Sequence, residues 1–129
     1  MSTPQTAPKL VSQYQWNDVP REQVKPDLGR RLITGERVML ANVELQRGCL
    51  VPQHAHVHEQ MSYVLDGCLR LTVGDNGAES YDLRAGDVVV IPSNVPHAAE
   101  ALEDTRVLDV FSPPREDWLN RTDSYLRTR

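Results

Sequence analysis

The stretch VPQHAHVHEQ (residues 51–60) carries three of the four histidines of the chain, at alternate positions. In an extended strand, residues two apart face the same side, so His54 and His56 can direct both imidazoles at one point, as a metal site requires. A straight strand rises about 3.3 Å per residue, which is too far for Gln60 to reach the same ion. If Gln60 joins the pair, we expect the chain to turn near residues 57–59 and to leave His58 in the turn, outside the ligand set.

Around this stretch the hydrophobic pattern is that of strands. In RVMLANVEL (residues 37–45), for example, every second residue from Met39 to Leu45 is apolar. Strands predicted from such patterns cover residues 37–45, 68–74, 87–92 and 106–111, with a tight turn at GDNG, residues 74–77. Glycine and proline breaks at short intervals favour an antiparallel sandwich or barrel. No helical repeat precedes residues 114–129, which could hold a short helix or lie across a partner.

Length and composition restrict the classes of protein. A chain of 129 residues is the size of one domain, and we expect a flexible lead-in over residues 1–12, a domain over 13–119 and a tail over 120–129. The formal net charge of −4 makes nucleic acid an improbable partner. No stretch has the length of a membrane span or the pattern of a secretory signal, so we expect a cytoplasmic protein.

The two cysteines give no sign of metal or redox chemistry. Cys49 and Cys68 are too few for a disulfide framework and do not form a C-x-x-C pair. We therefore expect both to be reduced and structural.

Two segments of the chain resemble the two motifs of the cupin family. The matching positions are Gly48, His54, His56, Gln60 and Gly67 in the first motif, and Gly86, Pro92 and His97 in the second. This resemblance implies an all-β, single-domain double-stranded β-helix, or jelly-roll barrel. It also implies that His54, His56, Gln60 and His97 hold one divalent metal ion, whose identity (Ni, Zn, Fe, Mn or Co) is open.

Two positions depart from the usual cupin motifs. Asn94 replaces a glycine, a mild change because asparagine tolerates left-handed backbone geometry. Gln60 replaces a glutamate, and its neutral amide leaves the ion its full double charge, which favours an anionic ligand. Because Gln60 cannot act as a general base, the proton chemistry must come from another residue.

LDVFSPPRED (residues 108–117) is the candidate source of that chemistry. On a strand, Asp109 and Phe111 face the same way, and Arg115 would stand at the mouth of the barrel. Phe111 could equally be plain core, and Arg115 could belong to a solvated charge cluster with Glu116 and Asp117. A buried aspartate is harder to dismiss, because an unpaired carboxylate in an apolar interior is costly.

Residues 31–119 together are similar to the small cupins of pectin degradation. This resemblance implies an enzyme that converts 4,5-unsaturated uronate monosaccharides, from pectin or alginate breakdown, to linear 4-deoxy-5-keto uronates. It assigns catalytic roles to Asp109, Phe111 and Arg115, with a small anionic sugar acid as substrate, and cupins are commonly homodimers. Two alternatives stay open: a dioxygenase with a mononuclear ferrous site, and a non-catalytic sugar-acid binding cupin.

Overall fold

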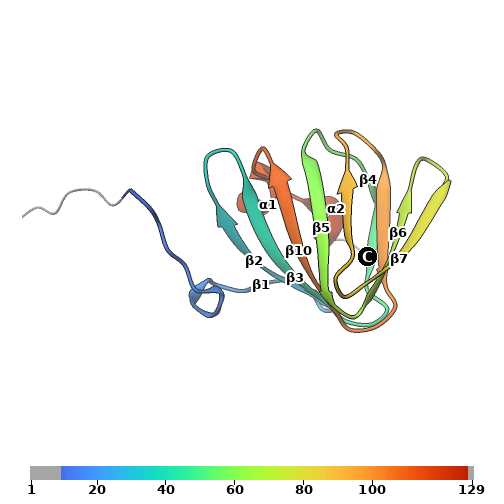
Figure 1. Ribbon diagram of the computed structural model, residues 1–129, viewed down its shortest axis with the longest axis horizontal. Coiled ribbons are helices and arrows are strands. Elements are labelled where there is room, and N and C mark those ends of the chain that lie inside the picture. The colour runs from blue at the N-terminus through green and yellow to red at the C-terminus, as the bar shows by residue number, and fades with distance from the viewer. Residues whose placement is uncertain (1–9, 128–129) are drawn as a thin grey trace, which may run out of the picture.

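The computed structural model describes residues 10–127. Residues 1–9 of the expected lead-in therefore lie outside the described residues, as do residues 128 and 129 of the tail. The described chain starts in an exposed segment that extends away from the barrel and contains a short 3₁₀ turn, η1 (Trp16–Asp18) (Figure 1).

Within these residues the chain forms two antiparallel sheets that face each other as the walls of a barrel (Figure 1). The larger sheet has the strand order β1 (Glu22–Lys25), β2 (Leu28–Thr34), β3 (Met39–Leu45), β10 (Thr105–Ser112), β5 (Glu59–Asp66) and β8 (Val88–Ile91). The smaller sheet has the order β4 (Leu50–His54), β9 (His97–Ala101), β6 (Cys68–Val73) and β7 (Glu79–Arg84). The fold is therefore the all-β jelly roll that the cupin resemblance implied.

The strands that could be predicted from the sequence are those in which buried and more exposed residues alternate clearly. In β3, Met39, Ala41, Val43 and Leu45 are all buried while the residues between them are half-buried. The four predicted strands correspond to β3, β6, β8 and β10, each within two residues at either end. Strands with a weaker apolar signal were not identified; in β7, for example, only Leu83 is buried.

Tight turns between the strands use residues that tolerate positive φ. Asn94 has φ 65°, so the asparagine that replaces the family's glycine adopts the left-handed geometry expected of it. Gly67, between β5 and β6, has φ 92°, and an added Cβ would lie 2.3 Å from the carbonyl oxygen of Asp104. Only glycine fits at this position.

The C-terminal segment packs against its own barrel. It contains two short helices, α1 (Glu116–Leu119) and α2 (Ser124–Arg127), and α2 contacts both β1 and β4. Asp123 is buried and accepts a hydrogen bond of 2.7 Å from Nη1 of Arg30, whose side chain is also buried. Of the two possibilities for this segment, helical structure is present, and a buried ion pair fastens the segment to β2.

Both cysteines are buried, and neither forms a disulfide within the described residues. Burial raises the pKa of Cys49 to about 12, which keeps it a thiol. In residues 10–127 there is no helix with the length and apolar character needed to cross a membrane.

Candidate metal centre and acid–base site

Three of the histidines converge inside the barrel. His54 ends β4, His56 follows it in the connection to β5, and His97 begins β9, directly opposite His54 in the sheet register. One ring nitrogen from each lies within 4.8 Å of the other two. The chain bends at residues 57 and 58, and His58 is not part of this cluster.

Backbone carbonyls determine which ring nitrogen of each histidine is free. Nδ1 of His54 lies 2.8 Å from the carbonyl oxygen of Pro52, Nδ1 of His56 lies 3.0 Å from that of His58, and Nδ1 of His97 lies 2.9 Å from that of Val95. A carbonyl can only accept, so each Nδ1 carries the hydrogen and each Nε2 keeps its lone pair. Nε2 of His97 is buried and has no hydrogen-bond partner among the described residues.

The imidazoles are held in their neutral form. Burial lowers the pKa of His54 to about 3 and that of His56 to about 4, and burial also lowers the pKa of His97. Neutral imidazole is the form that binds a metal ion. Three neutral rings that present lone pairs to one point therefore fit a divalent cation.

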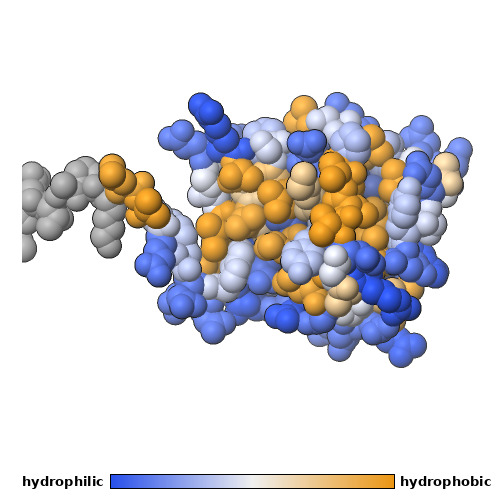
Figure 2. All heavy atoms as spheres, in the orientation of Figure 1, coloured by the Kyte–Doolittle hydropathy of each residue, from blue (hydrophilic) through white to orange (hydrophobic). Residues whose placement is uncertain are grey.

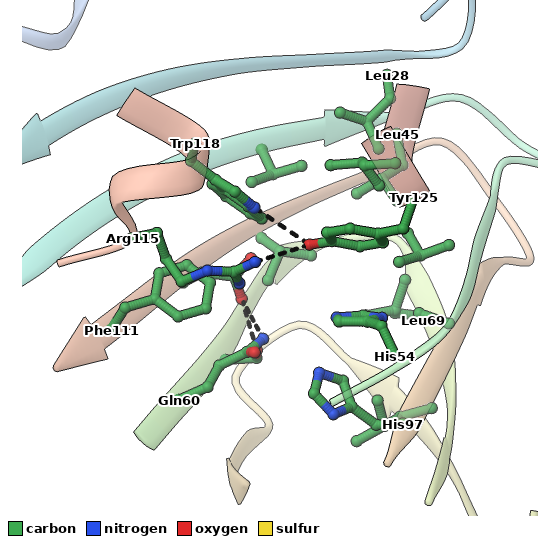
Figure 3. A pocket seen from close by; sticks show the side chains of 18 of the residues that line it. Leu28, Leu45, His54, Gln60, Leu69, His97, Phe111, Arg115, Trp118 and Tyr125 are labelled. Carbon is green, nitrogen blue, oxygen red and sulfur yellow. Dashed lines mark hydrogen bonds between the residues drawn. The ribbon is translucent and has the colours of Figure 1, made fainter. Parts of the chain in front are cut away.

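Gln60, on β5, offers a further donor atom beside these histidines. Its amide Nε2 donates to Oγ of Ser62 at 2.9 Å and to Oδ1 of Asp109 at 3.4 Å (Figure 3). These bonds turn Oε1 toward Nε2 of His56, at 3.2 Å. Because Nδ1 of His56 carries the hydrogen, Nε2 of His56 and Oε1 of Gln60 both present lone pairs and repel each other. A cation bound by both atoms would remove this repulsion. The residues present thus fit the metal that the cupin resemblance implies.

Asp109 lies next to this donor set, in the middle of β10. The sheet register places it opposite Ser62 and places Phe111 opposite Gln60, so both side chains face the interior. Asp109 is 8% exposed, and Oγ of Ser62 donates to its Oδ1 at 2.5 Å. Burial raises the pKa of Asp109 to about 6, although the bonds from Ser62 and Gln60 and the charge of Arg115 act in the opposite direction. The carboxyl group can therefore both give and take a proton near neutral pH.

Arg115, which we expected at the mouth of the barrel, is buried, so it does not belong to a solvated charge cluster. It is 2% exposed, and its guanidinium binds the carboxylate of Asp117 through Nε at 3.0 Å and Nη2 at 2.8 Å. It also lies over the rings of Phe111 and Trp118, 5.0 and 4.8 Å from their centroids. The paired carboxylate and the aromatic faces explain why the cation is tolerated inside. Its Nη1 is buried and has no hydrogen-bond partner among the described residues.

Phe111 is both core and cavity wall. It is 1% exposed, and its ring lies edge-on to His56 and Trp118, with centroids 5.9 and 5.0 Å away. The cavity that it lines has a volume of about 70 Å³. Figure 3 shows the polar side chains of Gln60 and Arg115 at one side of this cavity, facing His54 and His97. The rest of the wall is largely aliphatic, formed by Val43, Leu45, Leu69, Leu71, Leu83 and Val107 among others.

Sequence reasoning missed three polar or aromatic residues of the cavity: Ser62, Trp118 and Tyr125. Ser62 could have been found, because it follows Gln60 by two residues and so shares its face of β5. Trp118 and Tyr125 lie beyond the last strand, and no periodicity in the sequence indicates where that segment folds back.

The fold and the histidine cluster define this chain as a cupin. The model of the cupin domain family matches residues 41–111, and the chain belongs to that family. Among solved structures it is similar to KdgF from Halomonas sp., with 31% identity and a TM-score of 0.76 over 83% of this chain and 99% of that one.

Curated relatives include the oxalate decarboxylase OxdC of Bacillus subtilis, 31% identical over 77 residues, and an uncharacterized protein of Streptomyces coelicolor, 37% identical over 71 residues. These matches cover 58% and 54% of this chain but only 20% and 65% of the relatives, so the chain spans a part of each. A structure of the decarboxylase described for its Mn(II) centres is 26% identical, with a TM-score of 0.72 over 88% of this chain and 33% of that one. The relatives thus include an enzyme with Mn(II) centres.

Proposed function

We propose that the protein is a cytoplasmic, metal-dependent cupin enzyme that converts 4,5-unsaturated uronate monosaccharides to linear 4-deoxy-5-keto uronates. The observation that carries this proposal is the buried carboxyl group of Asp109, which accepts a hydrogen bond from Gln60 beside a cluster of three neutral histidines. An acid–base group beside a cationic centre suits a substrate that is an anion and needs proton transfer. Similarity to KdgF over nearly the whole of that chain supports the same assignment.

The reaction requires protonation at C4 of the enol ether, addition of water at C5, and ring opening. Asp109 is the proposed proton shuttle, because it is the carboxyl group of the cavity and its raised pKa, about 6, makes both protonation states accessible. Phe111 is the wall that orients the sugar ring. The oxygen of the added water becomes the C5 ketone when the bond from C5 to the ring oxygen breaks. The ring oxygen stays on C1 as a hydrate, which loses one water to form the aldehyde, so the net reaction is an isomerisation.

His54, His56, Gln60 and His97 are the proposed metal ligands. When bound, a divalent ion supplies positive charge that holds and polarises the substrate carboxylate. Arg115 assists through Nη1, since its Nε and Nη2 are engaged with Asp117. Which metal the site takes is open, and Mn(II) in the related decarboxylase adds one precedent.

The direct test is turnover. Purified protein of measured metal content is incubated with unsaturated galacturonate while the absorbance of the conjugated C4=C5 bond is followed. We expect a loss of absorbance faster than the spontaneous reaction, abolished by a chelator and restored by metal. A rate equal to the spontaneous one for metal-loaded protein would reject the uronate assignment.

A dioxygenase is the second candidate, and the aliphatic wall of the cavity favours it. That wall offers few hydrogen-bond partners for sugar hydroxyls, whereas molecular oxygen needs none. Three neutral imidazoles also suit ferrous iron. Iron in the purified protein together with substrate-dependent oxygen consumption would support this candidate, and zinc-loaded protein with full uronate turnover would exclude it.

Replacing Gln60 by glutamate should separate metal binding from turnover. The new carboxylate would face Asp109 across the present 3.4 Å contact and would also reduce the charge of the bound ion. We expect metal content to be kept or increased and turnover to fall by about tenfold or more, since about 1.4 kcal/mol of transition-state free energy corresponds to a factor of ten. Metal analysis and kcat are measured on the same preparation.

Gln53→Glu is the matched control, because it makes the same chemical change at an exposed position of β4. It should leave turnover unchanged. Wild-type kcat in Gln60→Glu would mean that the neutral ligand has no part in the reaction.

We also propose a homodimer formed through the outer face of the larger sheet. The sheet register aligns Leu40, Val110, Met61 and Val90 in one row across β3, β10, β5 and β8. Met61 and Val90 are 43% and 54% exposed. Figure 2 shows apolar surface gathered over these strands. Because a two-fold interface uses the same surface twice, one continuous apolar row can serve both subunits.

Met61→Glu should weaken that dimer by about tenfold or more, because it buries two unpaired carboxylates in the interface. Sedimentation velocity over a range of protein concentrations measures the effect. Leu50→Glu is the control, since Leu50 is 57% exposed on β4 of the smaller sheet. A monomeric wild-type protein, or equal dissociation of both variants, would contradict the proposed interface.

A further inference from the structure

The C-terminal helix α2 places a tyrosine at the histidine cluster. The ring of Tyr125 stacks on the imidazole of His54, with centroids 4.4 Å apart and an angle of 25° between the planes. Figure 3 shows Tyr125 extended into the cavity, between Trp118 and His54. Its hydroxyl group therefore lies beside the proposed metal ligands and beside Arg115.

Tyr125 is held firmly in this position. Leu126, the next residue, is 2% exposed and belongs to the core of the barrel. Asp123, two residues before it, forms the buried ion pair with Arg30, and Arg127 donates to the carboxylates of Asp123 and Glu22. A segment fixed by packing and ion pairs on both sides can position a side chain for binding.

The hydrogen bonds of Tyr125 leave its own hydrogen unused. Its oxygen accepts from Nη2 of Arg115 at 3.0 Å and from Nε1 of Trp118 at 3.1 Å (Figure 3). Neither nitrogen can accept a hydrogen bond, so both lone pairs of the oxygen are engaged, while within residues 10–127 the O–H has no acceptor. Nη1 of Arg115 is likewise buried and without a partner among the residues described. Two hydrogen-bond donors thus lie close together beside the histidines.

We propose that Tyr125 is a further ligand-binding residue of this site and that its hydroxyl donates a hydrogen bond to a carboxylate oxygen of the ligand. A carboxylate accepts several hydrogen bonds, and it can take one from Tyr125 and another from Nη1 of Arg115. The cation behind the hydroxyl strengthens it as a donor, because Arg115 withdraws electron density through the Nη2 bond. Tyr125 has this role only if the ligand is an organic acid, as the proposed function requires.

Binding of a sugar acid that cannot react tests this role without turnover. Zn²⁺-loaded wild-type protein and Tyr125→Phe are titrated calorimetrically with galacturonate, which lacks the C4=C5 bond, and with neutral galactose. Phenylalanine keeps the stack on His54, so we expect equal metal content. Affinity for galacturonate should fall about 10- to 100-fold, as for the loss of a hydrogen bond to a charged group, while galactose should bind alike to both proteins.

Tyr81→Phe, on the exposed face of β7, is the matched control and should bind galacturonate like the wild type. NMR of protein labelled with ¹³Cζ-tyrosine distinguishes ligand binding by Tyr125 from a purely structural role. The Tyr125 resonance is the one missing from the spectrum of Tyr125→Phe. Galacturonate should shift this resonance, and galactose should not. Wild-type affinity for galacturonate in Tyr125→Phe, an unmoved resonance, or no galacturonate binding by the wild type would overturn the role of Tyr125. The uronate assignment is judged separately, by turnover of unsaturated galacturonate in the wild type.

Discussion

Asp109→Asn should lower turnover of unsaturated galacturonate by at least about a hundredfold, within the 10²- to 10⁴-fold range that general acid–base catalysis contributes. Asparagine has nearly the same shape as aspartate, and its carbonyl oxygen can still accept the hydrogen bonds from Ser62 and Gln60 that Asp109 accepts at 2.5 and 3.4 Å. It cannot take up or release a proton. The fall should therefore appear in kcat, with metal content and thermal stability close to those of the wild type.

Asp82→Asn is the matched control for this substitution. Asp82 lies on β7, forms an exposed ion pair with Arg70 and does not line the cavity. Its replacement should leave kcat unchanged. If Asp109→Asn turned over the substrate at the wild-type rate, Asp109 would not be the shuttle, and the dioxygenase and binding-protein alternatives would regain their weight. A non-catalytic binder would have no turnover in either protein and would keep its ligand affinity.

His97→Ala should abolish stoichiometric metal binding. The substitution removes one of the three imidazoles whose nitrogens lie within 4.8 Å of each other, and His97 is the one contributed by the second motif. We expect metal affinity to fall by at least about a hundredfold, because replacing even an outer partner of a metal ligand costs about 10- to 100-fold. Metal content after dialysis, measured by mass spectrometry, should drop from about one ion per chain to a trace, and turnover should be lost with it.

His58→Ala is the control, since it also exchanges a histidine for alanine close to the site. His58 lies at the bend before β5 and outside the cluster, although its ring is 5.4 Å from that of His56. This variant should keep its metal. Equal metal content in His97→Ala and the wild type would show that the histidines do not form the metal site, and loss of metal from His58→Ala would show that the ligand set is different.

Much of this fold and of its candidate metal site could be predicted from the sequence, because the deciding features are local. Alternation in residues 37–45 depends only on the two-residue repeat of a strand, and β3 follows it. The spacing of His54 and His56 and the need for a turn before Gln60 follow from the rise of an extended chain. His97 was assigned to the ligand set because it matches the second cupin motif. The β4–β9 register places it opposite His54.

Only the tertiary structure decided the environment of the proposed catalytic groups. Whether Arg115 is solvated or buried depends on Asp117, Trp118 and Tyr125, whose positions result from the fold of the last segment. That segment is fixed by the ion pair between Asp123 and Arg30, residues 93 positions apart in the chain. Local periodicity carries no information about such a pairing. The sequence by itself therefore determined the strands and the His54–His56 pair, and its two cupin motifs implied the barrel and His97. Long-range packing and charge pairing brought Tyr125 to His54 and Ser62 to Asp109.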